Sequence, residues 1–263
     1  MVTAAGAGVV PTDGLAGDDG LRHEQVTFKV PGLDPAHDGL RVAQLSDLHV
    51  GNRTPDAMLR DAIAQANAFQ PDLVVLTGDY VCRKPWEVGK MREVLGGLAA
   101  PTLCVLGNHD VWVDAPGAAD SLRALGYEVL DNAWTTLRVR GEPLHVVGVG
   151  DFHTKRADVP RAMAGLPDSV TPLVLAHGPR TADELRARNR PMVCMSGHTH
   201  GGQISIPILT PLFLASMAHE PYVRGRYKLG DVQLYVNRGI GLSGIKVRIN
   251  SPPEVTLATL RRA

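Results

Sequence analysis

The sequence predicts an α/β (α+β) fold in which two mixed β-sheets pack face to face and helices cover their outer faces, giving a four-layer sandwich. Three observations predict this fold. Apolar runs of strand length alternate with helix-spaced runs in the first half, and further strand-like runs follow in the second half. The chain has 263 residues, of which 44% are hydrophobic, which suits one large core.

In the first half, strands are expected over 26–30 and 40–45. Thr54 is the expected N-cap of the first helix, with Pro55 at its first helical position and Asp56 in its first turn. Pro71 marks the end of this helix.

The continuous apolar run over 73–76 predicts a strand buried on both faces. A second helix is expected from the helical spacing of four apolar side chains, Val88, Met91, Leu95 and Leu98. A strand over 102–106 follows. This β-α-β-α-β order predicts a parallel sheet with right-handed crossovers.

The second half supplies the remaining strands, which are expected over 135–139, 144–149, 173–176, 192–195, 232–236 and 254–257. The sequence contains no stretch typical of a linker, so 21–263 is expected to form a single domain. Residues 1–20 are rich in Ala, Gly and Asp and lack the basic and apolar regions of a signal peptide, so a flexible tail is expected there.

Polar blocks follow the apolar runs at the points where strands should end. They are Asp47-Leu48-His49, Gly78-Asp79, Gly107-Asn108-His109-Asp110, His177, and Gly197-His198-Thr199-His200. Open parallel sheets bind ligands at the carboxyl ends of their strands, so these blocks should meet at one edge.

The residue types in these blocks suit a pair of metal ions. Imidazole nitrogens and carboxylate oxygens favour Mn, Fe and Zn, and a two-metal site needs a carboxylate that bridges the ions. We therefore expect two divalent transition metal ions, with seven candidate ligands: Asp47, His49, Asp79, Asn108, His177, His198 and His200. Asn108 contributes a neutral oxygen, so the site keeps a net positive charge that can attract a phosphate.

The order of the five blocks resembles that of the calcineurin-like metallophosphoesterases, from about residue 40 to the C-terminus. The resemblance implies that Asp79 bridges the two metals. It implies a first metal held by Asp47, His49, Asp79 and His200, and a second held by Asp79, Asn108, His177 and His198. It further implies that His109 acts on the phosphoryl group or the leaving oxygen, and that Asp110 orients His109.

The stretch Gly197-His198-Thr199-His200-Gly201-Gly202-Gln203 resembles a bacterial branch of this family, which includes hydrolases of UDP-2,3-diacylglucosamine and other cell-envelope phosphodiesters. The stretches 235–241 and 253–255 are also similar to that branch. Protein serine/threonine phosphatases of this superfamily follow the bridging aspartate with an aspartate-arginine-glycine run. Here Asp79 is followed by Tyr80-Val81-Cys82-Arg83, which weakens that interpretation. Arg180 stands where the branch usually has a carboxylate.

Three arginines follow candidate ligands within a few residues: Arg53, Arg83 and Arg180. Arginines in such places can clamp non-bridging phosphate oxygens with two hydrogen bonds. The alternative is that they are ordinary solvated loop arginines.

The other five histidines have no comparable company. His23 and His37 are expected at the surface, and His145 is expected to be satisfied locally within a strand. His153 and His219 either line the cleft or are structural.

Residues 204–218 are long, apolar and loop-like, and two prolines argue against a helix through the first half of this segment. The segment directly follows the histidine ligands. It therefore forms either an apolar lip that receives an acyl chain or touches a membrane, or a buried strand and loop that cover the core.

Composition excludes several classes of protein. Formal net charge is zero, so a strongly basic nucleic-acid surface is not indicated. No run reaches the length of a transmembrane helix. Three sparse cysteines, Cys82, Cys104 and Cys194, favour a reducing compartment. We expect a cytoplasmic protein whose contact with the inner membrane, if it has one, is peripheral and through 204–218; its oligomeric state stays open.

The leading hypothesis is a two-metal phosphodiesterase or pyrophosphate-bond hydrolase, with a small phosphate ester or a lipid-linked nucleotide sugar as substrate. A promiscuous soluble phosphomonoesterase is the alternative. A nuclease would need a basic groove, which a short neutral chain does not offer. A non-catalytic scaffold would be expected to lose ligands, whereas all seven ligands and His109 are intact.

Overall fold

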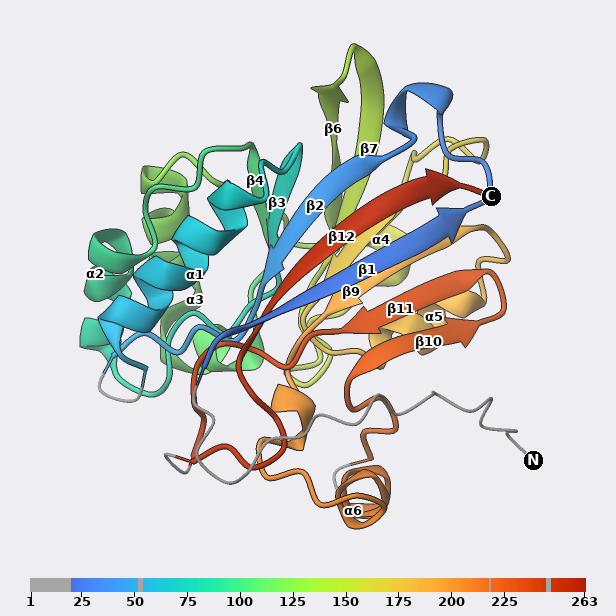
Figure 1. Cartoon of the computed structure of the whole chain (residues 1–263). Coiled ribbons are helices and arrows are strands. Elements are labelled where there is room, and N and C mark those ends of the chain that lie inside the picture. The colour runs from blue at the N-terminus through green and yellow to red at the C-terminus, as the bar shows by residue number, and fades with distance from the viewer. Residues whose placement is uncertain (1–19, 52–53, 218, 245–246) are drawn as a thin grey trace.

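The computed structural model describes residues 20–51, 54–217, 219–244 and 247–263. Two six-stranded sheets pack face to face in the described part of the chain, and helices cover their outer faces (Figure 1). This is the predicted four-layer arrangement. The expected tail over 1–20 lies almost wholly outside the described residues.

The first sheet has the order β1-β12-β2-β3-β4-β5. Its strands are β1 (Arg22–Val30), β12 (Glu254–Arg262), β2 (Leu40–Leu45), β3 (Leu73–Leu76), β4 (Thr102–Cys104) and β5 (Glu128–Val129). Strands β2 to β5 are parallel, as the β-α-β-α-β order predicts, and β12 is antiparallel to β2. The last strand of the chain thus lies inside the sheet, between the first two.

The second sheet has the order β10-β11-β9-β8-β7-β6. Its strands are β10 (Gly225–Leu229), β11 (Val232–Val236), β9 (Met192–Ser196), β8 (Leu173–Ala176), β7 (Glu142–Val149) and β6 (Ala133–Val139). The four central strands are parallel and the two edge strands are antiparallel to their neighbours, so both sheets are mixed.

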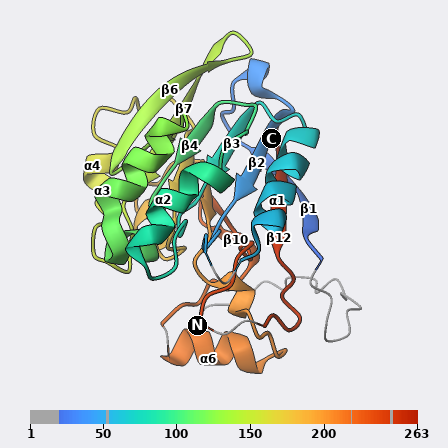
Figure 2. The ribbon, with the colours of Figure 1, turned by 90° about the vertical axis from the view of Figure 1, so that its left-hand side faces the viewer.

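Helices α1 (Asp56–Ala68), α2 (Pro85–Val94) and α3 (Asn108–Ala124) cover the first sheet, and α4 (Val159–Ala162) and α5 (Thr181–Arg186) cover the second. Short 3-10 turns occupy Pro35–His37 and His200–Gly202. Helix α6 (Leu209–Met217) lies apart from the other helices, at the lower end of the molecule in Figure 2. No helix in the described ranges combines the length and apolar character that crossing a bilayer requires.

Three layers of buried apolar side chains hold the sandwich together. The middle layer lies between the sheets and includes Phe28, Leu103 and Met195. The outer layers join each sheet to its helices, through residues such as Leu59 and Leu185. The all-apolar strand β3 is buried along its whole length because it has a helix layer on one face and the other sheet on the opposite face.

The predicted elements are present, with differences at their ends. Thr54 is not the cap of α1: Pro55 occupies the N-cap position, and the Thr54 hydroxyl accepts a hydrogen bond from the Leu242 backbone at 3.3 Å. His37 is buried rather than at the surface, with its Nε2 3.1 Å from the carbonyl oxygen of Val139. Tertiary contacts have displaced the local preference at both positions.

Candidate metal centre

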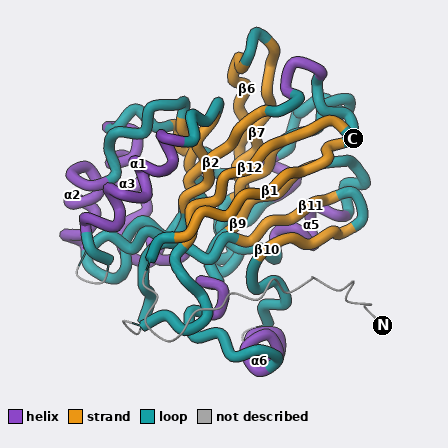
Figure 3. The backbone as a smooth tube through the Cα atoms, in the orientation of Figure 1, coloured by secondary structure: helices purple, strands orange, loops and turns teal. Residues whose placement is uncertain are grey.

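The candidate ligands come just after the ends of parallel strands of both sheets, which Figure 3 draws in orange with the loops in teal. Asp47 and His49 follow β2, Asp79 follows β3, and the remaining four follow β4, β8 and β9 in the same way. All seven predicted ligands therefore meet in one place, although they are up to 153 residues apart in the sequence.

The backbone is strained where it presents these side chains. Five of the seven ligands have positive φ angles: Asp47 (52°), His49 (45°), Asp79 (57°), His198 (74°) and His200 (52°). A non-glycine residue adopts this left-handed conformation only where its surroundings impose it, and such residues gather at functional sites. The strain points to a site selected for geometry rather than stability.

One group of side chains defines a first metal position. Nε2 of His200 lies 3.1 Å from Nε2 of His49 and 3.4 Å from Oδ1 of Asp47. Nε2 of His49 lies 3.8 Å from Oδ2 of Asp79. Ligand atoms bound to one ion at about 2.1 Å lie about 3.0–3.4 Å apart. The separations of 3.1 and 3.4 Å fit a common metal, and the 3.8 Å between His49 and Asp79 is slightly wider.

A second group lies on the other side of Asp79. Oδ1 of Asn108 lies 2.9 Å from Nδ1 of His198 and 3.1 Å from Nε2 of His177. Nε2 of His177 lies 3.3 Å from Oδ2 of Asp79. Of the seven candidate ligands, Asp79 is the one whose carboxylate lies near histidine side chains of both groups, as expected of a bridging ligand.

The histidine rings are fixed by their other nitrogens. Nδ1 of His49 lies 3.0 Å from the carbonyl oxygen of Val81, and Nδ1 of His177 lies 2.8 Å from that of Thr77. An N–H donated to a carbonyl leaves Nε2 unprotonated and aimed at the metal position, which is how metal-binding histidines are usually held.

Glycines allow the chain to pass close to the carboxylates. A Cβ at Gly197 would lie 1.9 Å from Oγ of Ser46 and 2.3 Å from Oδ2 of Asp47, and a Cβ at Gly107 would lie 2.2 Å from Oδ1 of Asp79. No side chain fits at either position, so the glycines of the sequence blocks are required by packing around the ligands.

Burial and neighbouring charges together set the charge of the ligands. It lowers the pKa of His49 to about 4, and it lowers the pKa of His198 and His200 well below the usual value, so these rings are neutral and can bind a metal. Burial alone would raise the pKa of Asp79, but the neighbouring His177 and His49 outweigh it and hold this carboxylate ionised.

His109 lies beside the first metal position without belonging to it. Its ring meets that of His49 edge-on, with centroids 4.9 Å apart, and also packs on the exposed Trp112. Its Nδ1 pairs with the carbonyl oxygen of Cys82, and its Nε2 lies 3.5 Å from Oγ of Ser243. This placement fits a group that acts on substrate rather than on metal.

Asp110 does not orient His109, contrary to the expectation from the sequence, because both ring nitrogens of His109 face other groups. The Asp110 carboxylate instead accepts hydrogen bonds of 2.8–3.1 Å from four backbone N–H groups, those of Asp79, Tyr80, Val81 and Gly107. Asp110 therefore shapes the loop that presents Asp79.

The three candidate arginines differ in where the structure places them. Arg53 lies outside the described residues. Arg83 is exposed, and the guanidinium of Arg180 lies 4.9 Å from the centre of the Phe152 ring, with Nε 4.0 Å from Asp183. Both remain candidates for contact with substrate, and the structure does not place either among the ligands.

Arg248 was missed in the sequence. Its guanidinium donates to the carbonyl oxygens of Gly239, Arg238 and Ser251, each at 3.0 Å, and lies 3.2 Å from Nδ1 of His200. It therefore ties the loop after β11 to the first metal position. A single arginine far from the ligand blocks carries no local signal that would have revealed this role.

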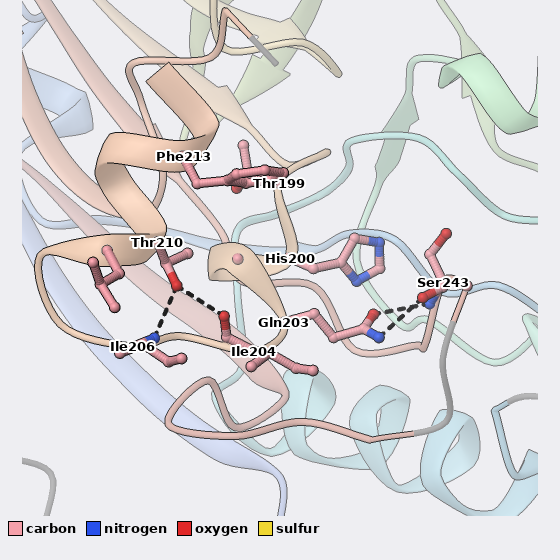
Figure 4. A pocket seen from close by; sticks show the side chains of 11 residues that line it. Thr199, His200, Gln203, Ile204, Ile206, Thr210, Phe213 and Ser243 are labelled. Carbon is pink, nitrogen blue, oxygen red and sulfur yellow. Dashed lines mark hydrogen bonds between the residues drawn. The ribbon is translucent and has the colours of Figure 1, made fainter. Parts of the chain in front are cut away.

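A pocket of about 610 Å³ opens beside His200 (Figure 4). The polar side chains of Gln203 and Ser243 line this pocket together with the apolar side chains of Ile206, Leu209 and Phe213. The side chain of Gln203 is joined to the backbone of Ser243 by hydrogen bonds of 2.9 and 3.0 Å.

The segment 204–218 is not a buried strand and loop. Five of its large apolar side chains are exposed: Ile206, Ile208, Leu209, Leu212 and Phe213. Its second half forms α6, while the hydroxyl of Thr210 joins the backbone of Ile204 and Ile206 and so fixes the turn before the helix (Figure 4). The segment therefore presents an apolar surface that lines one pocket together with the ligand His200.

Two metal positions bridged by a carboxylate, at the carboxyl edge of two packed sheets, define a candidate dinuclear hydrolase. The family model for calcineurin-like phosphoesterases matches residues 40–202, which include all seven ligands. The chain belongs to this family of metallophosphoesterases.

Several curated relatives match almost the whole chain. Phosphodiesterase YaeI of Escherichia coli is 34% identical, covering 91% of this chain and 87% of the relative. UDP-2,3-diacylglucosamine pyrophosphatase LpxG of Chlamydia trachomatis is 29% identical, covering 90% and 88%. Metallophosphoesterase YkuE of Bacillus subtilis is 31% identical, covering 89% and 84%.

Solved structures support the fold. A 5′-nucleotidase precursor from Thermus thermophilus superposes with a TM-score of 0.51 at 17% identity, covering 84% of this chain and 54% of the nucleotidase chain. The chain thus spans about half the length of that structure, and the likeness concerns the fold alone.

Proposed function

We propose that this chain hydrolyses phosphodiesters or pyrophosphate-linked compounds that carry an apolar arm, with a lipid-linked nucleotide sugar as the substrate class. The observation that carries the proposal is the pocket lined both by the ligand His200 and by the exposed apolar side chains Leu209 and Phe213 of α6. The relatives named as a phosphodiesterase and as a UDP-2,3-diacylglucosamine pyrophosphatase support the same class.

The residues suit two divalent ions of the Mn, Fe or Zn type, because the donor atoms are imidazole nitrogens, carboxylate oxygens and one amide oxygen. When bound, such a pair polarises phosphoryl oxygens and activates water. Asp79 would bind both ions, and His109, whose ring adjoins that of His49, would donate a proton to the leaving oxygen or stabilise the transferring phosphoryl group.

Charge favours a diester over a monoester. A monoester dianion needs positive side chains in addition to the metals, whereas a diester has one charge and a second organic arm. Ile206, Leu209 and Phe213 offer an apolar surface for that arm. Burial of an acyl chain there contributes about 25 cal/mol for each Å² of apolar contact.

The exposed apolar face of α6 also suits peripheral contact with the membrane in which such a substrate resides. A cytoplasmic chain that touches the inner membrane through this face would reach the phosphate of the substrate without extracting its acyl chains.

The diester claim is tested with two aryl substrates. After the metal content has been measured, kcat/KM is compared for bis(p-nitrophenyl) phosphate and p-nitrophenyl phosphate. We expect the diester to be turned over faster. Faster turnover of the monoester would remove the diester claim and favour the soluble phosphomonoesterase.

The lipid claim is tested with acylated and deacylated forms of one nucleotide sugar. We expect a higher kcat/KM for the acylated form, and we expect Leu212→Asp and Phe213→Asp to abolish that preference. Equal turnover of both forms by the unaltered chain would leave a phosphoesterase without lipid specificity.

A further inference from the structure

A second group of titratable side chains lies against the metal centre and is not part of it. Asp151 and His153 come from the turn after β7, and Glu220 comes from the segment between α6 and β10. The ring of His153 stacks on that of the ligand His198, with centroids 3.6 Å apart and planes inclined by 22°. The group therefore adjoins the second metal position.

The geometry of this group is that of a cation site. Nε2 of His153 lies 3.6 Å from Oε2 of Glu220, close to the separation of about 3.4 Å for two ligands of one tetrahedral ion. One ligand atom from each of His153, His198 and Glu220 lies within 4.8 Å of the others. Nδ1 of His198 already faces Asn108 at the second metal position. The His198 ring therefore borders this site but is not counted among its ligands.

The second ring nitrogen of His153, Nδ1, also has the surroundings that are typical of a metal-bound histidine. Its Nδ1 lies 3.8 Å from Oδ1 of Asp151, whose other oxygen accepts a hydrogen bond of 2.7 Å from the backbone of Thr154. Metal-binding histidines usually have a carboxylate or carbonyl beside the nitrogen that does not bind the metal, and Asp151 occupies that place.

Glu220 is the group that requires a partner. It is 2% exposed, and neither carboxylate oxygen has a hydrogen-bond partner among the described residues. A buried carboxylate without donors is costly, and such groups are normally paired or bound to a metal. The cluster contains two buried carboxylates and one imidazole, so its negative charge exceeds what His153 can balance.

We propose that His153 and Glu220 bind a third divalent transition metal ion, next to the dinuclear centre. A neutral imidazole nitrogen and a carboxylate oxygen suit Mn, Fe, Co or Zn, and the charge of the ion balances the two carboxylates. The side chain of His153 is 24% exposed, so water completes the coordination. With two protein ligands, this is the weakest of the three sites.

The test counts bound Mn²⁺. The chain is stripped of metal and titrated with Mn²⁺, and free Mn²⁺ is measured by its electron paramagnetic resonance signal. We expect saturation at three ions per chain, the last with the lowest affinity. Glu220→Gln and His153→Gln should each saturate at two, and the exposed Glu184→Gln on α5 is the matched control that should keep three.

Saturation of the unaltered chain at two ions, or retention of three by both Glu220→Gln and His153→Gln, would overturn the proposal. Circular dichroism monitors folding of each variant; if Glu220→Gln fails to fold, the partly exposed His153→Gln decides. The readout is independent of substrate, so a failed third site would leave the proposed phosphodiesterase function in place.

Discussion

The metal centre and the α6 segment, which both contribute residues to the pocket beside His200, are built in opposite ways. Five of the seven ligands have strained backbones, and side chains such as His49 and His177 are fully buried and hydrogen-bonded to carbonyl groups. The α6 segment presents Leu212 and Phe213 to solvent. Under the proposed function, the contrast separates two tasks. The reaction would depend on many buried side chains, and the choice of substrate would depend on an exposed surface that can change without disturbing them.

The largest effect should come from the bridge between the two metals. We expect Asp79→Asn to lose metal and to lower kcat by more than any change at His109, because the Asp79 carboxylate lies next to both candidate metal positions. Elemental analysis and kcat for bis(p-nitrophenyl) phosphate measure the two effects. Retention of both metals by Asp79→Asn, together with metal loss in His109→Ala, would reverse the two roles.

The second largest effect should come from a change that lowers the reaction rate without removing the metals. His109→Ala should keep its metals and lower kcat by about 10²–10⁴-fold, as expected for loss of a general acid. His145→Ala is the matched control, because His145 pairs with Thr136 in the second sheet and should leave kcat unchanged. A His109→Ala variant with ordinary kcat and full metal content would remove His109 from the chemistry.

A third prediction concerns the tight packing around the ligands. Gly197→Ala should lower kcat by about 10²-fold through displacement of Asp47, since its Cβ would overlap Ser46 and Asp47. Gly89→Ala in α2 is the control: its Cβ would have no neighbour within 4 Å, and the free energy of unfolding should rise by about 0.5–1 kcal/mol. Equal kcat for the two variants would show that the ligand loops are more adaptable than the structure indicates.

The difference between the two regions also explains what could be predicted from the sequence. The ligands follow apolar strand-forming runs, so their residue types and their positions in the chain both carry signal, and all seven meet as expected. Asp110 was placed wrongly because its role depends on a loop 31 residues earlier, whose N–H groups it binds.

Helix α3 was missed because it begins at the ligand Asn108 itself, and its first turn consists of site residues rather than an apolar stripe. The environment of 204–218 could not be decided because an apolar run has the same composition whether it is buried or exposed. Its exposure follows from its position beyond the edge of the sandwich, which no local pattern encodes (Figure 2).

The smallest effect on the fold, and the sharpest test of the contrast, comes from α6. Leu212→Asp and Phe213→Asp should change the free energy of unfolding by no more than about 0.5 kcal/mol, because both side chains are exposed. Leu76→Ala in the buried strand β3 should lower the free energy of unfolding by about 2–5 kcal/mol.

On bis(p-nitrophenyl) phosphate, kcat/KM of the α6 variants should match that of the unaltered chain. On an acylated nucleotide sugar, kcat/KM should fall about tenfold or more, since each apolar side chain contributes about 1.5–3 kcal/mol when buried. A comparable loss on both substrates would mean that α6 supports the metal centre, and the division between reaction and substrate choice would not hold.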